Sequence, residues 1–453
     1  MKTVTIRSAL GLLYALAALP LAADSPQTSV KYVLQGVRKP GDTDRVVIRL
    51  EVGGDVLQAV ETEIHRMKLS VVCDLSYDEK VLQLPNASDG RARSIRHYDQ
   101  VDPVIKVEDD GMKPVLRPQR RLIGVQVDPP KVTLFSPNGK LTRDELELVD
   151  ILGNSLLLEQ LLPEGPVAVG ESWSHDEKLI LALLGMDVAS RVDVQSKLTE
   201  VTGTAARFEL SGRVEGALCG AATEIELKAK YRFDRRTRRI DWLGLLIQEK
   251  RGVGHVKRGV DVVARLQVRI SPEATPAALT EAALEDLSLQ PTAALEPLSY
   301  QSAEGGWQLT HDRRWHLIGE NPDLAVLRMV DRGELIAQCN VSPLPKLAAN
   351  KEVPLSAFQD DVRKALGESF GEFIEAAQWA SDADHRIYRV VVQGKVAELP
   401  IQWHYYLVSD KHGRQVAFAF SVEGNLVDRL DDADQKLVDS LRFLEPKVAS
   451  SGK

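Results

Sequence analysis

Four closely spaced residues, Ser172, Ser174, His175 and Asp176, are of the types that build a serine hydrolase site. In such sites the serine, the histidine and the acid come from distant positions and converge on one path for the proton. Side chains this close in sequence do not normally converge, so we expect no catalytic residue here. The pattern instead predicts that Asp176 begins a short helix that contains Leu179.

Two further groups contain side chains of the types that bind metal ions. They are His311 with Asp312 and His316, and Asp382 with Asp384 and His385. Neither group has the Cys-x-x-Cys spacing of zinc sites or two histidines four residues apart on a clear helix. Both stand in polar stretches beside predicted strands, so we predict solvated turns, no metal site and no cofactor.

Four arginines, Arg235, Arg236, Arg238 and Arg239, surround one threonine between two predicted strands. One interpretation is a solvated hairpin tip. The other is a contact with an anionic surface such as lipid headgroups.

The chain has three cysteines, which are too few for a disulfide scaffold. In an exported protein Cys73 could pair with Cys219, leaving Cys339 unpaired. The alternative is three isolated thiols that pack as small apolar side chains.

Most of these residues are expected to lie on or between strands. From 29 to 271 apolar and polar residues alternate with a period of two, which is typical of strands. It is sharpest at residues 222–234, where Ile225, Leu227, Ala229, Tyr231 and Phe233 alternate with charged residues. Side chains flip faces at every residue of a strand, so one face is expected to be buried and one exposed. Similar segments at 188–201, 205–214, 240–249 and 260–270 predict long antiparallel strands, which must twist and curve.

A filler for the curved sheet is predicted upstream. Thr142 and Glu145 form a capping box, and Leu146, Val149, Leu152 and Leu156 follow at helical spacing. A sheet wrapped around this helix would form a half-barrel. We expect an apolar ligand to lie between sheet and helix, lined by Leu146, Val149, Leu152, Ile225, Leu227 and Tyr231.

The strand at 240–249 is apolar on both faces. Trp242 and Leu246 point one way, and Leu243, Leu245 and Ile247 point the other. Such a strand is covered on both sides. We expect Leu243, Leu245 and Ile247 to face outward, under a cover made by another element such as the linker, by the second domain or by a partner.

The character of the chain changes after 271. Residues 272–303 are rich in Ala, Pro, Glu and Leu and are predicted to be an unpacked linker. Residues 304–445 mix strands and amphipathic helices, as in an α+β domain. Residues 446–453 are expected to be a disordered tail.

The first 23 residues have the layout of a secretory signal peptide, with Lys2 and Arg7 before an apolar stretch and small residues before Asp24. We therefore expect a periplasmic or secreted protein. No second segment is long and apolar enough to span a membrane. The net charge of -8 argues against a nucleic-acid partner.

Two stretches of the first domain carry a resemblance. Residues 166–173, Pro-Val-Ala-Val-Gly-Glu-Ser-Trp, resemble a motif of exported bacterial domains of unknown function, whose curved sheets are similar to Lol-type lipoprotein-carrier half-barrels. The run from Tyr77-Asp78-Glu79 through 225–233 to Val268 is similar to planctomycete-type secreted proteins. The resemblance covers 29–271 and implies no catalytic residues.

The second domain resembles the PsbP-like sandwich of the oxygen-evolving complex and related exported proteins. The strand Trp403-His404-Tyr405-Tyr406, the strand 418–420 and the ending 438–443 carry this resemblance. The chain departs from the family at Trp315, where a preceding proline is expected. The resemblance implies a binding or assembly module.

Together these patterns predict an α+β protein, with a long curved antiparallel half-barrel at 24–271 and a smaller sandwich domain. We expect an exported, non-enzymatic binding protein that holds a hydrophobic small molecule or lipid. The alternatives are an envelope assembly protein that docks on a macromolecular partner, or a hydrolase without a local motif.

Overall fold

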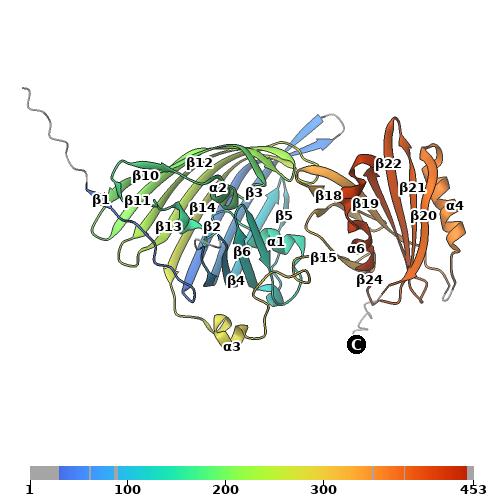
Figure 1. Ribbon diagram of the computed structural model, residues 1–453, viewed down its shortest axis with the longest axis horizontal. Coiled ribbons are helices and arrows are strands. Elements are labelled where there is room, and N and C mark those ends of the chain that lie inside the picture. Colours follow the sequence, from blue (N-terminus) through green and yellow to red (C-terminus); the bar gives the residue numbers. More distant parts are fainter. Residues whose placement is uncertain (1–29, 61–62, 86–89, 349–350, 382, 446–453) are drawn as a thin grey trace, which may run out of the picture.

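Two open antiparallel sheets dominate the protein. The computed structural model describes residues 30–60, 63–85, 90–348, 351–381 and 383–445. A long curved sheet forms the first part of the chain, and a smaller body follows it, orange to red in Figure 1. The predicted signal peptide 1–23 and tail 446–453 lie outside the described residues.

The described part of the first sheet has twelve strands, in the order β7-β6-β4-β3-β2-β14-β13-β12-β11-β10-β9, with β5 paired to β4. Its strands are β2 (Thr43–Val60), β3 (Glu63–Gln83), β4 (Ala92–Val107), β5 (Asp110–Met112), β6 (Leu122–Asp128), β7 (Lys131–Phe135), β9 (Ser172–Ser174), β10 (Val188–Val201), β11 (Ala205–Leu218), β12 (Ala221–Asp234), β13 (Arg239–Arg251) and β14 (Gly259–Pro272). A separate pair joins β1 (Lys31–Tyr32) to β8 (Val167–Ala168). The five long strands predicted between 188 and 270 are confirmed.

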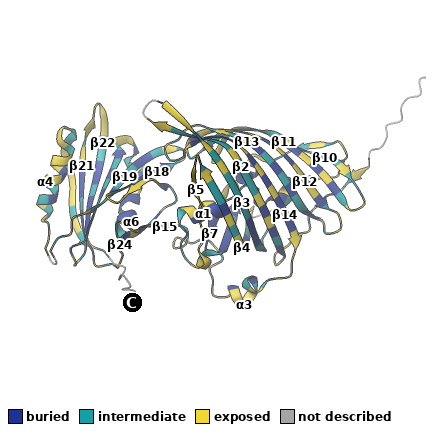
Figure 2. Cartoon of the chain, turned by 180° about the vertical axis from the view of Figure 1, so that it is seen from behind, coloured by how far each residue is buried: buried dark blue, intermediate teal, exposed yellow. Residues whose placement is uncertain are grey.

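The alternation along β12 is confirmed. Ile225, Leu227 and Tyr231 are buried, whereas Glu226 and Lys228 are exposed. Figure 2 shows the same change between buried and exposed positions along the neighbouring strands.

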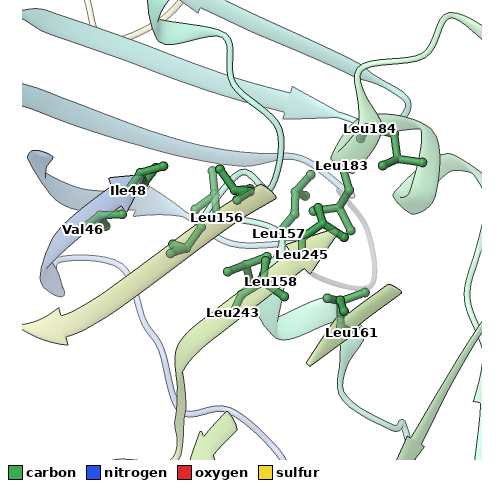
Figure 3. Packing of buried hydrophobic residues seen from close by; sticks show 14 of the residues in the cluster. Val46, Ile48, Leu156, Leu157, Leu158, Leu161, Leu183, Leu184, Leu243 and Leu245 are labelled. Atoms are coloured by element: carbon green, nitrogen blue, oxygen red, sulfur yellow. The ribbon is translucent and has the colours of Figure 1, made fainter. Parts of the chain in front are cut away.

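The concave face of the sheet wraps a segment that contains α1 (Arg143–Val149), the 3-10 helix η2 (Leu158–Leu161) and α2 (Glu177–Leu184). The predicted capping box starts α1, because Thr142 Oγ1 accepts from the Glu145 amide and Glu145 accepts from the Thr142 amide. In Figure 3 leucines from this segment, including Leu156 and Leu161, lie among side chains of β2 and β13. This segment fills most of the half-barrel.

The helix is shorter than its apolar spacing predicts. It ends at Val149, so Leu152 and Leu156 lie in the irregular chain beyond it. Gly153 adopts φ 70°, and a Cβ there would lie 2.8 Å from Leu266 Cδ2 on the sheet. The left-handed conformation at Gly153 favours glycine and is incompatible with a helix that continues through this position.

The prediction that Leu243, Leu245 and Ile247 face outward is wrong. These side chains are buried in the core of the half-barrel, opposite residues of β12 that also point inward. The pairing of β12 with β13 skips Asp241, which is the extra residue of a β-bulge. The bulge lets Ile240 and Leu243 share the inner face, and it leaves Trp242 on the outer face.

The segment predicted as an unpacked linker, 272–303, packs on the first sheet. It contains the 3-10 helix η3 (Ala277–Leu279) and α3 (Glu281–Leu284). Leu279 and Leu284 are buried against Ile95 and Leu122. The segment ends in a strand, β15 (Leu298–Ser302), which already belongs to the second body.

The described part of the second body has a seven-stranded sheet, in the order β17-β18-β19-β23-β22-β21-β20, and a smaller sheet β15-β16-β24. Its further elements are β16 (Trp307–His311), β17 (Trp315–Asn321), β18 (Leu324–Asp331), β19 (Glu334–Leu344), α4 (Leu355–Leu366), the 3-10 helix η4 (Gly367–Ser369), β20 (Phe370–Ala380), β21 (Arg386–Val396), β22 (Leu399–Ser409), β23 (Gln415–Glu423), the 3-10 helix η5 (Gly424–Leu426), α5 (Val427–Leu430), α6 (Ala433–Asp439) and β24 (Arg442–Phe443). Separate apolar clusters lie on its two faces, one under α4 and one under α5 and α6. The α+β expectation is confirmed in part, because sheets outweigh the few helices.

Of the two alternatives for the cysteines, the structure has the isolated thiols and not the Cys73–Cys219 pair. Cys73, Cys219 and Cys339 are free thiols. Cys73 is buried inside the sheet on β3, whereas Cys219 lies at the turn between β11 and β12 with φ 47°. In the part of the chain that the structure describes, no helix is long and apolar enough to cross a membrane.

Candidate functional site

A pocket of about 610 Å³ opens where the filling segment leaves one end of the half-barrel. Its apolar walls come from α1 and the chain after it, from α2, and from the concave face of β12 and β13. The apolar side chains that line it include Leu146, Ile151, Leu152, Leu184, Ile225 and Ile247. We call this space the mouth pocket.

The six side chains predicted to line a ligand site divide into two groups. Leu146, Leu152 and Ile225 line the mouth pocket. Val149, Leu227 and Tyr231 belong to the same apolar cluster, but they pack inside the filled half-barrel.

Charged side chains form the rim of the mouth pocket, and most have partners within the protein. Lys257 pairs with Glu147, and Arg251 pairs with Glu249 at 3.2 Å. The carboxylate of Asp187 accepts a hydrogen bond from the backbone amide of Cys219. An incoming ligand would therefore meet an apolar interior behind a rim of paired charges.

The second body closes one side of the mouth pocket. Arg143, on α1, donates hydrogen bonds from Nη2 to the carbonyls of Arg313 at 2.6 Å and Trp315 at 2.9 Å. His316 lines the pocket, and burial lowers its pKa to about 3. A neutral imidazole thus faces the pocket from the second body at neutral pH.

Cys219 also lines the mouth pocket. Burial is the largest cause that raises the pKa of its thiol, and the Asp187 carboxylate raises it further. The other two cysteines are 5% and 0% exposed, so Cys219 is the accessible thiol of the described residues.

The hydrolase-type residues at 172–176 do not assemble with one another. His175 Nε2 lies 2.7 Å from Ser196 Oγ, and Tyr231 Oη lies 2.9 Å from the same oxygen. Ser196 is 1% exposed, so this hydroxyl is not open to a substrate. As predicted, Asp176 is the N-cap of α2 and accepts from the Lys178 amide at 2.8 Å.

A Gly-x-Ser-x-Gly pattern occurs at Gly367-Glu368-Ser369-Phe370-Gly371, which the sequence analysis missed. In hydrolases this pattern forms a sharp turn from a strand into a helix. Here it follows helix α4 and leads into strand β20, which is the reverse order. The pattern is therefore a helix C-terminus and not a nucleophile elbow.

The two groups with metal-binding side-chain types were predicted to be solvated turns, but His311 and His385 are buried and make other contacts. His311 Nδ1 lies 2.9 Å from the carbonyl of Asp312, whose carboxylate binds Arg314. Asp384 adopts φ 58° in a turn before His385, and Asp382 lies outside the described residues. No group of three or more His, Cys, Asp or Glu side chains in the described ranges has a metal-binding arrangement.

Arginines around Thr237 hold the segment before β2, which contains Tyr32 and Gln35, against the sheet. Arg238 donates to the carbonyl of Gln35, and the Arg235 guanidinium lies over the Tyr32 ring. Arg239 is buried and pairs with Asp42 and Asp44. Arg235, Arg236 and Arg238 are exposed at the turn between β12 and β13, as the hairpin-tip interpretation predicts, whereas Arg239 is buried.

A buried ionic network was not predicted from the sequence. Glu79 accepts from Arg96 Nε at 2.8 Å and from Arg38 Nη2 at 2.7 Å, and it is 0% exposed. Arg96 also contacts Asn154 and Ser155 of the filling segment. The alternation along β3 could have revealed this network. Glu79 is on the same face of the strand as Leu75 and Tyr77, whose side chains point inward.

Comparisons with known proteins give distant structural likenesses only. No family model matches the chain, and no curated protein matches it either. The cyanobacterial PsbP of Synechocystis sp. PCC 6803 is similar over 32% of this chain and 92% of that protein, with 16% identity and a TM-score of 0.27. A mutant of the protein Mog1 is similar over 34% of this chain and 98% of its own length, with 10% identity and a TM-score of 0.27.

A lipovitellin structure described by its lipid-protein interactions is also similar. The match covers 53% of this chain and 26% of that chain, with 10% identity and a TM-score of 0.31. No function is carried over from scores this low.

Proposed function

We propose that the protein is an exported, non-enzymatic binding protein that holds an apolar small molecule, or the acyl chain of a lipid, in the mouth pocket. The observation that carries the proposal is the apolar wall formed by Leu146, Leu152 and Ile225 beside an otherwise filled half-barrel. A volume of about 610 Å³ falls within the range of small-molecule sites, roughly 300 to 1,000 Å³.

The rim supports an apolar occupant. Four of its charges form two ion pairs, Lys257 with Glu147 and Arg251 with Glu249, so a charged ligand group would have to displace a partner to pair with any of these four. Burial of apolar surface, at about 25 cal/mol per Å², is then the main source of affinity. The neutral His316 and Arg143, whose Nη2 donates to two backbone carbonyls of the second body, place polar groups at the entrance.

A catalytic role is not part of the proposal. The Ser196 hydroxyl that contacts His175 is buried and also bonded to Tyr231. Export is part of it and rests on the signal-like residues before Asp24, so N-terminal sequencing of the mature protein should begin near Asp24.

The thiol of Cys219 provides a direct test. In delipidated full-length mature protein, palmitate or N-phenyl-1-naphthylamine should slow the reaction of Cys219 with a maleimide several-fold, because the occupant covers the thiol. A rate of alkylation that neither compound changes contradicts the proposal.

A variant that fills the mouth pocket provides a second test, with a matched control. Leu152→Trp should reduce binding of the naphthylamine dye at least tenfold, because the indole occupies the pocket. Leu317→Trp, at an exposed position of β17, should leave binding unchanged. Equal dye binding by the two variants would place the dye elsewhere.

A further inference from the structure

A second hollow lies on the outer face of the curved sheet, away from the mouth pocket. Its volume is about 950 Å³, and outward side chains of β2, β10, β11, β12, β13 and β14 line it. Strand register places Arg207, Arg232, Trp242, Arg269 and Val47 side by side across five strands. We call this the outer hollow.

Trp242 forms the aromatic part of the outer hollow. A Cβ at Gly244 would lie 2.7 Å from Trp242 Cη2, so the indole lies over the glycine, along the strand. Trp242 is partly exposed on this face. The bulge at Asp241 and the glycine at 244 together present an aromatic surface to the hollow.

Five cationic side chains and three carboxylates line the outer hollow among the described residues. Arg45 pairs with Asp78 and Asp99, which lie outside the lining, and Arg207 pairs with Glu200. Arg232 forms a two-point ion pair with Asp241, at 2.8 and 2.7 Å. Arg269 stands beside Trp242 and has no carboxylate partner in the described part of the chain.

We propose that the outer hollow binds an acidic saccharide. The apolar face of a sugar ring packs on Trp242, and its carboxylate or sulfate contacts Arg269. The ion pairs of Arg232 with Asp241 and of Lys230 with Glu209 supply both donors and acceptors to ring hydroxyls. A hollow of about 950 Å³ has room for a sugar ring, whereas a bilayer surface would meet a flat or protruding face.

Titration calorimetry of the full mature chain tests the proposal, with hexagalacturonate and a heparin hexasaccharide as acidic probes and maltohexaose as the neutral control. At least one acidic probe should bind saturably and at least tenfold more tightly than maltohexaose. Trp242→Ala and Arg269→Gln should each weaken that binding at least tenfold.

Two outward variants on the same strands are the matched controls. Leu246→Ala on β13 and Arg265→Gln on β14 lie outside the outer hollow and should change affinity less than twofold. The proposal is overturned if neither acidic probe binds saturably, or if Trp242→Ala and Arg269→Gln bind as the controls do. Tighter Trp242-dependent binding to phosphatidylglycerol vesicles or single-stranded DNA would overturn it in favour of that class.

Discussion

Glu79 and Arg96 form an ion pair inside the half-barrel, with 2.8 Å between the carboxylate and Nε and side chains that are 0% and 3% exposed. Glu79 also accepts from Arg38 and from Ser155 Oγ at 2.8 Å, so one carboxylate joins the start of the chain, the sheet and the filling segment. These partners hold the pKa of Glu79 well below its usual value, against the opposing effect of burial.

Glu79→Gln should destabilise the first sheet by about 3 to 5 kcal/mol, because it leaves Arg96 buried without its counter-charge, whereas Arg38 keeps Asp44. Urea unfolding of the full chain, followed by far-ultraviolet circular dichroism, measures the change. Glu209→Gln is the control, since its pair with Lys230 is exposed and worth at most about 1 kcal/mol. Equal losses in both variants would mean that the buried network contributes no more than a surface pair.

A pH dependence is expected from His175. Burial lowers its pKa to about 4 from the ordinary value of 6.5, so the folded protein keeps the imidazole neutral where the unfolded chain binds a proton. Stability should therefore fall as the pH falls from about 6.5 to about 4. In His175→Asn the melting temperature should depend less steeply on pH across that interval.

His65→Asn serves as the control for the pH experiment. His65 is exposed on β3, and its replacement should leave the slope of the wild-type protein unchanged. An unchanged slope in His175→Asn would show that other groups, such as His311, account for the dependence.

The segment 272–303 should resist proteolysis in the wild-type protein, because Leu279 is 0% exposed against Ile95 and Leu122. Leu279→Ala removes about 2 to 5 kcal/mol of packing and should speed cleavage by a glutamate-specific protease at least tenfold. Gln290→Ala, at an exposed position, is the control. If the wild-type chain is cleaved as fast as Leu279→Ala, the segment is an unpacked linker after all and the packing of Leu279 does not protect it.

Local patterns in the sequence predicted the elements whose causes are local. The alternation at 222–234, the capping box at Thr142 and the N-cap at Asp176 all appear in the structure. Each depends on backbone geometry over a few residues, which period-two alternation or one side-chain hydrogen bond reveals. Leu146 and Ile225 also reach the mouth pocket for this reason, since their helix or strand face was predictable, whereas Leu152 reaches it from irregular chain beyond the helix.

Other features depended on residues far apart in the chain. A bulge against β12 decides that Leu243 points inward and Trp242 outward. The partners of Glu79 lie up to 76 positions away, at Ser155. The sequence by itself determined the strand periodicity and the helix starts, because those are properties of one segment. Only the tertiary structure decided which strand faces point inward, which charges pair, and where the mouth pocket and the outer hollow lie. These features depend on strand register and on packing between segments that are far apart in the sequence.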